Sequence, residues 1–232
     1  EDIMRITWLG HSGFRIEIEG AVLLVDPWLT GNPMFPEGRA AEATRGATHV
    51  LVTHGHGDHA SNAVAIAKRA GIKIACIHEL SEVLGAEGAG TIGFGKGGTI
   101  DLAGARVTMV NACHSASMDF KDGLGHAGSE AGLMIAGEGH TIYVTGDTTV
   151  MADMEWMGEY FAPDIGILCA GGHYTMDMKM AAWAARKYFA FRTVFPCHYR
   201  TFPLLAQSAE ELRAGLPGVT VIEPEVLEPI TV

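Results

Sequence analysis

Short runs of apolar residues recur along the chain and predict a series of β-strands. The run at residues 14–19 alternates apolar and polar positions, which is typical of a half-buried strand, whereas residues 21–25 are apolar throughout and predict a fully buried one. Further strands are predicted at residues 3–9, 48–53, 72–77, 105–111, 130–136, 140–145, 164–169 and 193–197, with two weaker strands or turns at 219–222 and 228–232.

Segments with a helical spacing of apolar residues alternate with many of these strands. Helices are predicted over residues 61–70, 79–84, 151–160 and 177–189, the last with one apolar face. Three segments rich in glycine or proline, at 30–46, 85–98 and 115–129, are predicted to be loops. Because no linker interrupts the pattern, residues 1–232 are expected to form a single α/β domain of two packed sheets with helices outside.

The composition narrows the class of protein. Of the 232 residues, 48% are hydrophobic and 19% are charged, which provides material for a core and argues against disorder. The net charge of -11 argues against a general nucleic-acid binder, because phosphate binding requires a basic surface. No apolar run approaches the length of a spanning helix, and the N-terminal segment lacks the form of a signal peptide. We therefore expect a cytoplasmic protein that does not bind membranes.

The four cysteines are far apart and form no CxxC pair. Such isolated cysteines are expected to be reduced, buried on strands and part of the core, which suits a reducing compartment. They are Cys76, Cys113, Cys169 and Cys197.

Three histidines and an aspartate lie within seven residues, in the run Thr53-His-Gly-His-Gly-Asp-His59. In an extended segment, His54 and His56 point the same way, so both imidazoles can reach one metal ion. Asp58 and His59 follow a turn and are expected to reach a second point nearby. The two intervening glycines remove side-chain bulk and are expected to permit unusual backbone angles. The run therefore predicts a metal site mounted on the end of a strand.

Three more residues of metal-ligand type follow apolar strands. They are His114, Asp147 and His198. A single histidine at a strand end is usually a surface or capping residue. Three such ends, each carrying histidine or aspartate, together favour a site for two metal ions.

The order of these motifs resembles that of the metallo-β-lactamase superfamily over nearly the whole chain. The five motifs are Asp26 in Leu-Leu-Val-Asp-Pro, the run ending at His59, His114, Asp147 in Gly-Asp-Thr, and His198. Within that superfamily, the segments 8–14, 53–59 and 171–177 are similar to the UPF0173 metal-dependent hydrolases. The resemblance implies an αββα four-layer sandwich, in which two mixed β-sheets are flanked by helices and the site lies at one edge of the sheets.

The resemblance also implies a dinuclear metal centre with a bridging hydroxide. Two divalent ions are expected, with Zn²⁺ first and Mn²⁺ or Fe²⁺ as alternatives. Asp26 is implied to hold the opening loop, or the tautomer of a ligand histidine, from behind the ligands. The resemblance implies that the first ion is held by His54, His56 and His114. It implies that the second ion is held by Asp58, His59 and His198. Asp147 is implied to bridge the two ions.

A count of charges favours hydrolysis. Two divalent ions, the carboxylates of Asp58 and Asp147, and one hydroxide leave a net charge of +1, which would attract an anionic substrate or stabilise an oxyanion. A bound metal ion can also lower the pKa of water to about 7. We therefore predict a metal-dependent hydrolase that cleaves an ester-type bond of a small molecule, such as a phosphodiester, lactone, thioester or amide.

Two further histidines, each next to glycine, complete the set of candidates. The resemblance places His11 and His173 near the metal ions, where they could contact substrate or donate a proton to the leaving group. The alternative is that each is a hydrogen-bonded support for other residues. The candidate catalytic residues are thus Asp58, His11 and His173.

Other functions remain open at this point. One alternative is an iron-containing redox enzyme on the same fold, although only 34 residues follow His198, so no flavodoxin partner domain is expected there. Another is an RNA-processing nuclease, against which the acidic balance and the lack of a basic arm argue. A non-catalytic binding module is the third, and the presence of all seven expected ligands argues against it. The exact substrate, and whether the chain forms a homo-oligomer, also stay open.

Overall fold

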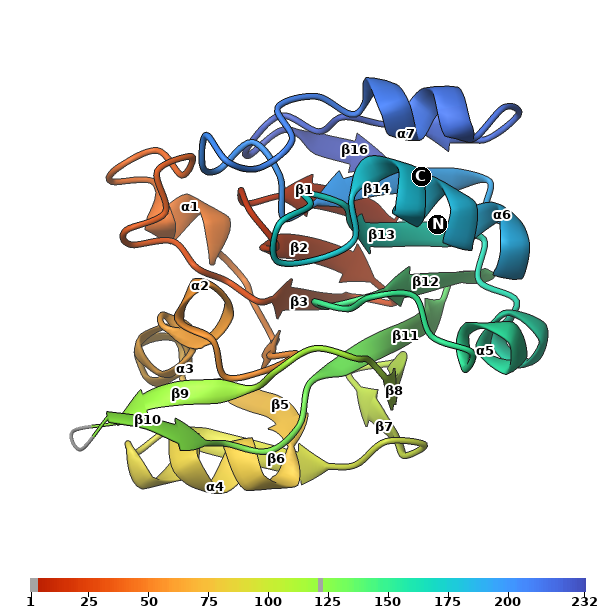
Figure 1. The fold of residues 1–232 in the computed structure, drawn as a ribbon. Coiled ribbons are helices and arrows are strands. Elements are labelled where there is room, and N and C mark those ends of the chain that lie inside the picture. The colour runs from red at the N-terminus through yellow and green to blue at the C-terminus, as the bar shows by residue number, and fades with distance from the viewer. Residues whose placement is uncertain (1–3, 121–122) are drawn as a thin grey trace.

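The computed structural model describes residues 4–120 and 123–232, in which two seven-stranded sheets pack face to face (Figure 1). The first sheet has the spatial order β16 (Pro229–Thr231), β1 (Arg5–Trp8), β2 (Phe14–Ile18), β3 (Ala21–Val25), β4 (His49–Leu51), β5 (Lys73–Ile77) and β6 (Gly90–Phe94). The second has the order β15 (Thr220–Val221), β14 (Thr193–Cys197), β13 (Ile165–Cys169), β12 (His140–Val144), β11 (Ala131–Gly137), β8 (Ala105–Asn111) and β7 (Thr99–Leu102).

Both sheets are mixed, and they follow the same plan. In the first sheet, the pairs from β16 to β3 are antiparallel and those from β3 to β6 are parallel. In the second, the pairs from β7 to β12 are antiparallel and those from β12 to β15 are parallel. Parallel strands require crossover connections, and helices supply several of them here.

Helices cover the outer faces of the two sheets (Figure 1). On the side of the first sheet lie α2 (Gly57–Ala60), α3 (Ala63–Ala70) and α4 (His78–Ala86). On the side of the second lie α5 (Met154–Phe161), α6 (Met178–Tyr188) and α7 (Glu210–Gly215). The short helix α1 (Ala40–Ala43) interrupts the long loop after β3. The layers therefore run helix, sheet, sheet, helix, as expected from the resemblance.

Strand β3 shows how the apolar pattern builds these layers. Successive side chains of a strand point to opposite faces of its sheet. Leu23 and Val25 accordingly pack between the two sheets, whereas Leu24 packs beneath the helices that cover the first sheet. All three side chains are fully buried. The uninterrupted apolar run is thus explained by burial on both faces.

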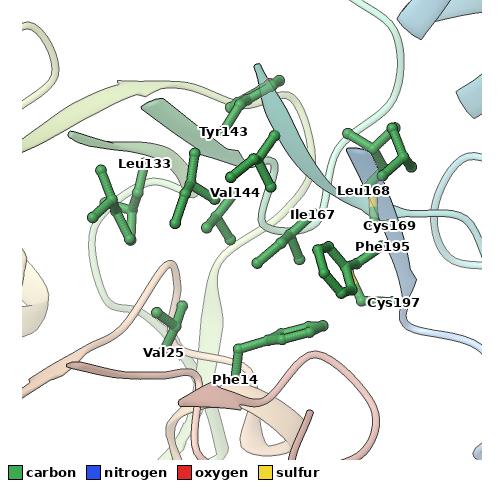
Figure 2. Packing of buried hydrophobic residues seen from close by; sticks show 14 of the residues in the cluster. Phe14, Val25, Leu133, Tyr143, Val144, Ile167, Leu168, Cys169, Phe195 and Cys197 are labelled. Atoms are coloured by element: carbon green, nitrogen blue, oxygen red, sulfur yellow. The ribbon is translucent and has the colours of Figure 1, made fainter. Parts of the chain in front are cut away.

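The core between the sheets is filled by aromatic and branched side chains (Figure 2). Phe14 and Val25 extend from the first sheet towards Leu133, Ile167 and Phe195 of the second, and all five are buried. Burial of one such side chain stabilises the fold by about 1.5–3 kcal/mol. This packing holds the two sheets as a rigid base for the loops at their edges.

The prediction of a loop over residues 85–98 was wrong, because β6 lies within that segment and pairs in parallel with β5. Gly93, one of the glycines that suggested a loop, serves close packing instead. A Cβ atom on Gly93 would lie 2.5 Å from Oγ of Ser81, so α4 can approach the strand only because Gly93 has no side chain.

The segment 115–129 also differs from its prediction as a loop. It contains the antiparallel pair of β9 (Ser117–Phe120) and β10 (Gly123–His126), and residues 121–122 lie outside the described residues. Gly55 of the histidine-rich run explains how this hairpin is seated. A Cβ atom on Gly55 would collide with the side chain of Met118 on β9. The hairpin therefore packs directly onto the run.

Smaller differences concern the ends and number of elements. Strand β7 and helices α1, α2 and α7 were not predicted, and the helix predicted over 61–70 corresponds to α3. Residue 3, the predicted start of the first strand, lies outside the described residues. Within residues 4–120 and 123–232, no helix is both long enough and apolar enough to cross a membrane.

Candidate metal centre

The predicted ligands emerge from the ends of four strands. The run that contains His54 follows β4, His114 follows β8, Asp147 follows β12, and His198 directly follows β14. Asp58 and His59 lie in the first turn of α2, which begins inside the run. Strands and the helix that follows them are rigid mounts, and precise ligand geometry requires such mounts.

The first cluster consists of three histidines. His54, His56 and His114 each offer a nitrogen atom, and these atoms all lie within 4.8 Å of one another. Nε2 of His54 and Nδ1 of His56 are 3.0 Å apart. Three imidazoles that converge on one point can hold a divalent ion such as Zn²⁺.

The second cluster contains Asp58, His59 and His198, together with His11. Nε2 of His198 lies 3.6 Å from Oδ2 of Asp58, and Nε2 of His59 lies 3.7 Å from the same oxygen. Asp58 and His59 were expected to reach a second point beside the first cluster, and in the structure they meet His198 there.

Asp147 lies between the two clusters. Its Oδ2 atom is surrounded by Nε2 atoms of four histidines, at 3.1, 3.3, 3.5 and 3.9 Å. In order of distance, they belong to His198, His59, His114 and His54. The first cluster supplies two of these histidines and the second supplies the other two. A carboxylate in this position can contact an ion in either cluster.

Asp26 contacts the predicted ligands from behind, in the position that its motif implied. Its Oδ1 atom accepts a hydrogen bond from the backbone N–H of Thr53 (2.8 Å), and its Oδ2 accepts from Nδ1 of His59 (2.8 Å) and from the hydroxyl of Thr53 (2.7 Å). Since the Thr53 hydroxyl donates to Asp26, it accepts from Nδ1 of His54 (3.0 Å). Asp26 thus fixes the tautomers of two histidines and leaves Nε2 of each free to bind a metal ion.

The chemistry of the donor atoms fits a metal ion. Nε2 of His59 and Oδ1 of Asp147 are buried and have no hydrogen-bond partner among the described residues. Buried polar atoms normally have a partner, so two such atoms at the meeting point of the clusters are unusual. Imidazole nitrogen and carboxylate oxygen are ligands that suit zinc, manganese and iron.

Burial and charge oppose each other at the histidines. Burial lowers the pKa of His54 and His56, and neighbouring histidines lower both further. Burial also lowers the pKa of His198, but the carboxylates of Asp147 and Asp58 outweigh it and raise the pKa to about 9. Asp147 would have a raised pKa through burial alone, yet His59 and His198 hold it well below the usual range. In the metal-free protein, the second cluster therefore holds protons that a metal ion must displace.

The backbone at the site is strained at three polar residues. His11, Asp26 and His198 have φ values of 54°, 43° and 56°, in the left-handed region. Each such residue costs on the order of 1–3 kcal/mol and persists where the surroundings hold it in place. Gly55 and Gly57 were expected to need unusual backbone angles, and neither has a positive φ. The need at Gly55 is for space beside Met118.

His11 lies inside the protein rather than on the cavity wall. Its side chain is fully buried, and its Nε2 donates to Oδ2 of Asp58 over 2.8 Å because a carboxylate can only accept. In the neutral imidazole, Nδ1 accepts from the hydroxyl of Thr201 at 2.7 Å. Burial lowers the pKa of His11 to about 4, against the hydrogen bond to Asp58, which raises it. The hydrogen bond to Asp58 thus links the buried His11 to a residue that lines the cavity.

His173 lies apart from both clusters. It is exposed, with a φ of 58°, and its ring packs edge-on against that of Tyr174 at a centroid distance of 4.5 Å. Tyr174, rather than His173, lines the cavity beside the metal ligands. The predicted role of His173 in proton transfer stays a prediction.

Sequence reasoning missed Thr53, Thr201, Tyr174 and Phe202. Thr53 and Thr201 hold Asp26 and His11, and Tyr174 and Phe202 line the cavity. Tyr174 and Phe202 could have been found from their positions, because they follow the ends of β13 and β14, as His198 follows β14. The cysteine prediction was wrong at Cys113, which is exposed, whereas the other three cysteines are buried and all four are free.

Comparison with known proteins places the chain in a family. Residues 5–198 match the model of the beta-lactamase superfamily domain. The chain is 69% identical over 230 residues to a UPF0173 metal-dependent hydrolase of Cereibacter sphaeroides, across 99% of this chain and 100% of the relative. The chain belongs to the UPF0173 metal-dependent hydrolases of the metallo-β-lactamase superfamily.

Other members agree with this assignment. A UPF0173 metal-dependent hydrolase of Paracoccus denitrificans is 66% identical over 228 residues, which are 98% of this chain and 99% of the relative. A solved metallo hydrolase from the archaeon Ignicoccus hospitalis is 32% identical, with a TM-score of 0.87 over 99% of this chain and 98% of that one. The predicted αββα fold is confirmed. The prediction that the protein is a metal-dependent hydrolase is confirmed at the level of its family.

Proposed function

We propose that this UPF0173 protein binds two divalent metal ions and hydrolyses an ester-type bond of a small molecule. The observation that carries the proposal is the position of Asp147, whose Oδ2 lies 3.1–3.9 Å from four histidine nitrogens of two clusters. A carboxylate within reach of two sets of ligands can bridge two ions of a two-metal site. We propose zinc as the metal, with manganese or iron as alternatives, because the ligands are imidazoles and carboxylates.

The proposed ligands divide as the clusters do. Each ion has three ligands of its own and shares Asp147 with the other. The ligands proposed for the first ion are His54, His56 and His114, and those for the second are Asp58, His59 and His198.

The protein's own groups direct the reaction. Bound divalent ions supply Lewis acidity and a water with a pKa near 7. Asp58 is a half-buried carboxylate on the cavity wall, so it can accept a proton from the attacking water. His11 and Thr201 hold that carboxylate in place, and Asp26 and Thr53 hold the ligand histidines. We assign His11 to positioning Asp58, because its side chain has no exposed surface.

We further propose that the enzyme works in the cytoplasm on a small molecule rather than on nucleic acid. Four free cysteines fit a reducing compartment. The net charge of -11 opposes binding to a polyphosphate backbone. The cavity at the ligands, about 450 Å³, falls within the range that small ligands occupy.

Removal and return of the metal test the proposal. The protein would be stripped with a chelator, reloaded with Zn²⁺ and assayed on lactones, aryl esters and a bis-aryl phosphate. We expect turnover to disappear on stripping and to return with about two zinc ions per chain. His114→Ala should abolish turnover, whereas His140→Ala should not, because His140 pairs with Asp164 away from the site. Equal turnover by the metal-free protein would contradict the proposal.

A further inference from the structure

The cavity beside the predicted metal ligands is lined by those ligands and by two aromatic side chains. His56, His114 and His198 form part of it, and Tyr174 and Phe202 complete it from the loops after β13 and β14. Tyr174 is 55% exposed, so much of its side chain is open to solvent. A substrate in this cavity would therefore meet aromatic faces next to the bond to be broken.

Both aromatic rings are held by neighbouring rings. The Phe202 ring lies 6.2 Å from Trp28 and 5.8 Å from His11, as measured between centroids. The Tyr174 ring lies 4.5 Å from His173 and 6.5 Å from His198. A wall that is already ordered loses little entropy when a ligand packs against it, so an apolar group gains affinity there.

A second cavity of about 440 Å³ adjoins the first, and the two share His114 and Ser115. It lies against the β9–β10 hairpin, and its wall includes the carboxylate of Glu130. That carboxylate accepts a hydrogen bond from the backbone N–H of His114 at 2.8 Å. This neighbour disfavours a negatively charged part of a substrate.

The described side chains that line the two cavities offer no permanently cationic partner for an anionic group. Among the residues that the structure describes, neither cavity is lined by lysine or arginine. An anionic tail would lose its hydration without gaining a salt bridge, and that costs binding. The positive charge of the metal centre is then left to stabilise the carbonyl oxygen of the bond that is cleaved.

We propose that the substrate is an uncharged carboxylic ester or lactone whose apolar acyl group packs against Tyr174 and Phe202. This inference rests on the proposed function and names its substrate class. In the reaction, the oxygen of water forms a bond to the carbonyl carbon, and the bond from that carbon to the leaving oxygen breaks. One proton of the water goes to the leaving alkoxide, so the products are a carboxylic acid, which ionises, and an alcohol.

A series of p-nitrophenyl esters tests the inference with one leaving group throughout. The zinc-loaded enzyme would be assayed on acyl chains from acetate to hexanoate, and on valerate against the hemiglutarate, which has similar length and an added carboxylate. We expect kcat/KM to rise about two- to fourfold per methylene until the wall is covered. We also expect the valerate to exceed the hemiglutarate by about tenfold or more.

Variants show whether the two rings are responsible. Tyr174→Ala and Phe202→Leu should flatten the dependence on chain length, chiefly through KM, and should weaken binding of the non-hydrolysable ketone benzylacetone to the metal-free protein. Tyr160→Ala is the matched control, because Tyr160 is 78% exposed on α5 and does not line the cavity. Tyr174→Ala removes an exposed side chain, so loss of folding is not expected.

The results separate this inference from the proposed function. A flat chain-length profile, a preference for the hemiglutarate, or variants with the parent's profile would overturn the inference while metal-dependent turnover stood. Absence of metal-dependent turnover on every ester, lactone and phosphate would instead remove the proposed function, and the inference with it.

Discussion

Oδ2 of Asp26 accepts a hydrogen bond from Nδ1 of His59 across 2.8 Å, and both side chains are buried. The contact leaves Nε2 of the His59 ring facing Asp147 at 3.3 Å. Asp26 itself stands at a φ of 43°, which is a strained backbone angle. The strained residue Asp26 thus orients the ring of His59, which is expected to bind metal.

Replacement of this carboxylate by an amide should weaken metal binding without unfolding the protein. In Asp26→Asn, Oδ1 can still accept from Thr53, but an amide nitrogen cannot accept the His59 proton. Asparagine also tolerates the left-handed region. We expect affinity for Zn²⁺ to fall about 10- to 100-fold, as measured by competition with a chromophoric chelator.

The chain offers a matched control for that variant. Asp164 accepts from Nδ1 of His140 (2.7 Å) and from the backbone N–H of Thr141 (2.9 Å), in the same pattern, away from the clusters. Asp164→Asn should leave zinc affinity unchanged. A similar loss in both variants, or no loss in Asp26→Asn, would show that Asp26 does not orient a ligand.

Zinc affinity should rise with pH in the range where His198 loses its proton. Burial lowers the pKa of His198, but the carboxylates of Asp147 and Asp58 outweigh burial and raise it to about 9. The metal-free protein therefore keeps the His198 proton at neutral pH. A metal ion must displace it, and the cost falls as the pH approaches 9. We expect at least about a tenfold gain in affinity per pH unit between pH 6 and 8. Affinities that stay constant after correction for the chelator's own protonation would argue against this.

Two helix ends provide a test of backbone strain away from the site. Ala162 ends α5 at a φ of 43°, and Gly71 ends α3 at a φ of 66°, where a Cβ atom would have no neighbour within 4 Å. Ala162→Gly should therefore raise the free energy of unfolding by about 1 kcal/mol, and Gly71→Ala should lower it by a similar amount. Urea titration measures both. Shifts of the same sign in the two variants would contradict the assignment of strain.

One thiol should react in the native protein. Cys113 is exposed, whereas burial raises the pKa of Cys76 to about 12 and that of Cys169 to about 11. Ellman's reagent should therefore detect one fast thiol in the native protein and four in denaturant. Cys113→Ser should remove the fast reaction. Rapid reaction of a second thiol would show that the core opens more readily than its packing indicates.

The residues of the candidate metal centre could be found from the sequence because ligand chemistry leaves a local signal. The run from His54 to His59 concentrates ligand residues at a strand end, and His114, Asp147 and His198 repeat that position. Asp26 was expected to support either the loop or a histidine, and the structure shows both contacts. The resemblance implied their division into two ligand sets, and that division stays a prediction, although the ligand atoms of His54, His56 and His114 do lie within 4.8 Å of one another.

The rest of the site depends on contacts between distant segments, for which the sequence has no local signal. Gly93 and Gly55 have ordinary backbone angles, and their role appears only where Ser81 and Met118 approach them. Glycine therefore led to loop predictions where strands are present. His11 could be placed near the metal ions but not on the correct side of Asp58, because its burial is set by packing from other loops.

Anomalous diffraction from crystals of the zinc-loaded protein would show whether Asp147 bridges two metal ions. We predict two zinc peaks about 3.5–4 Å apart, one among His54, His56 and His114, the other among Asp58, His59 and His198, with Asp147 in contact with both. A single peak at saturating zinc, or two peaks that Asp147 does not join, would contradict the account.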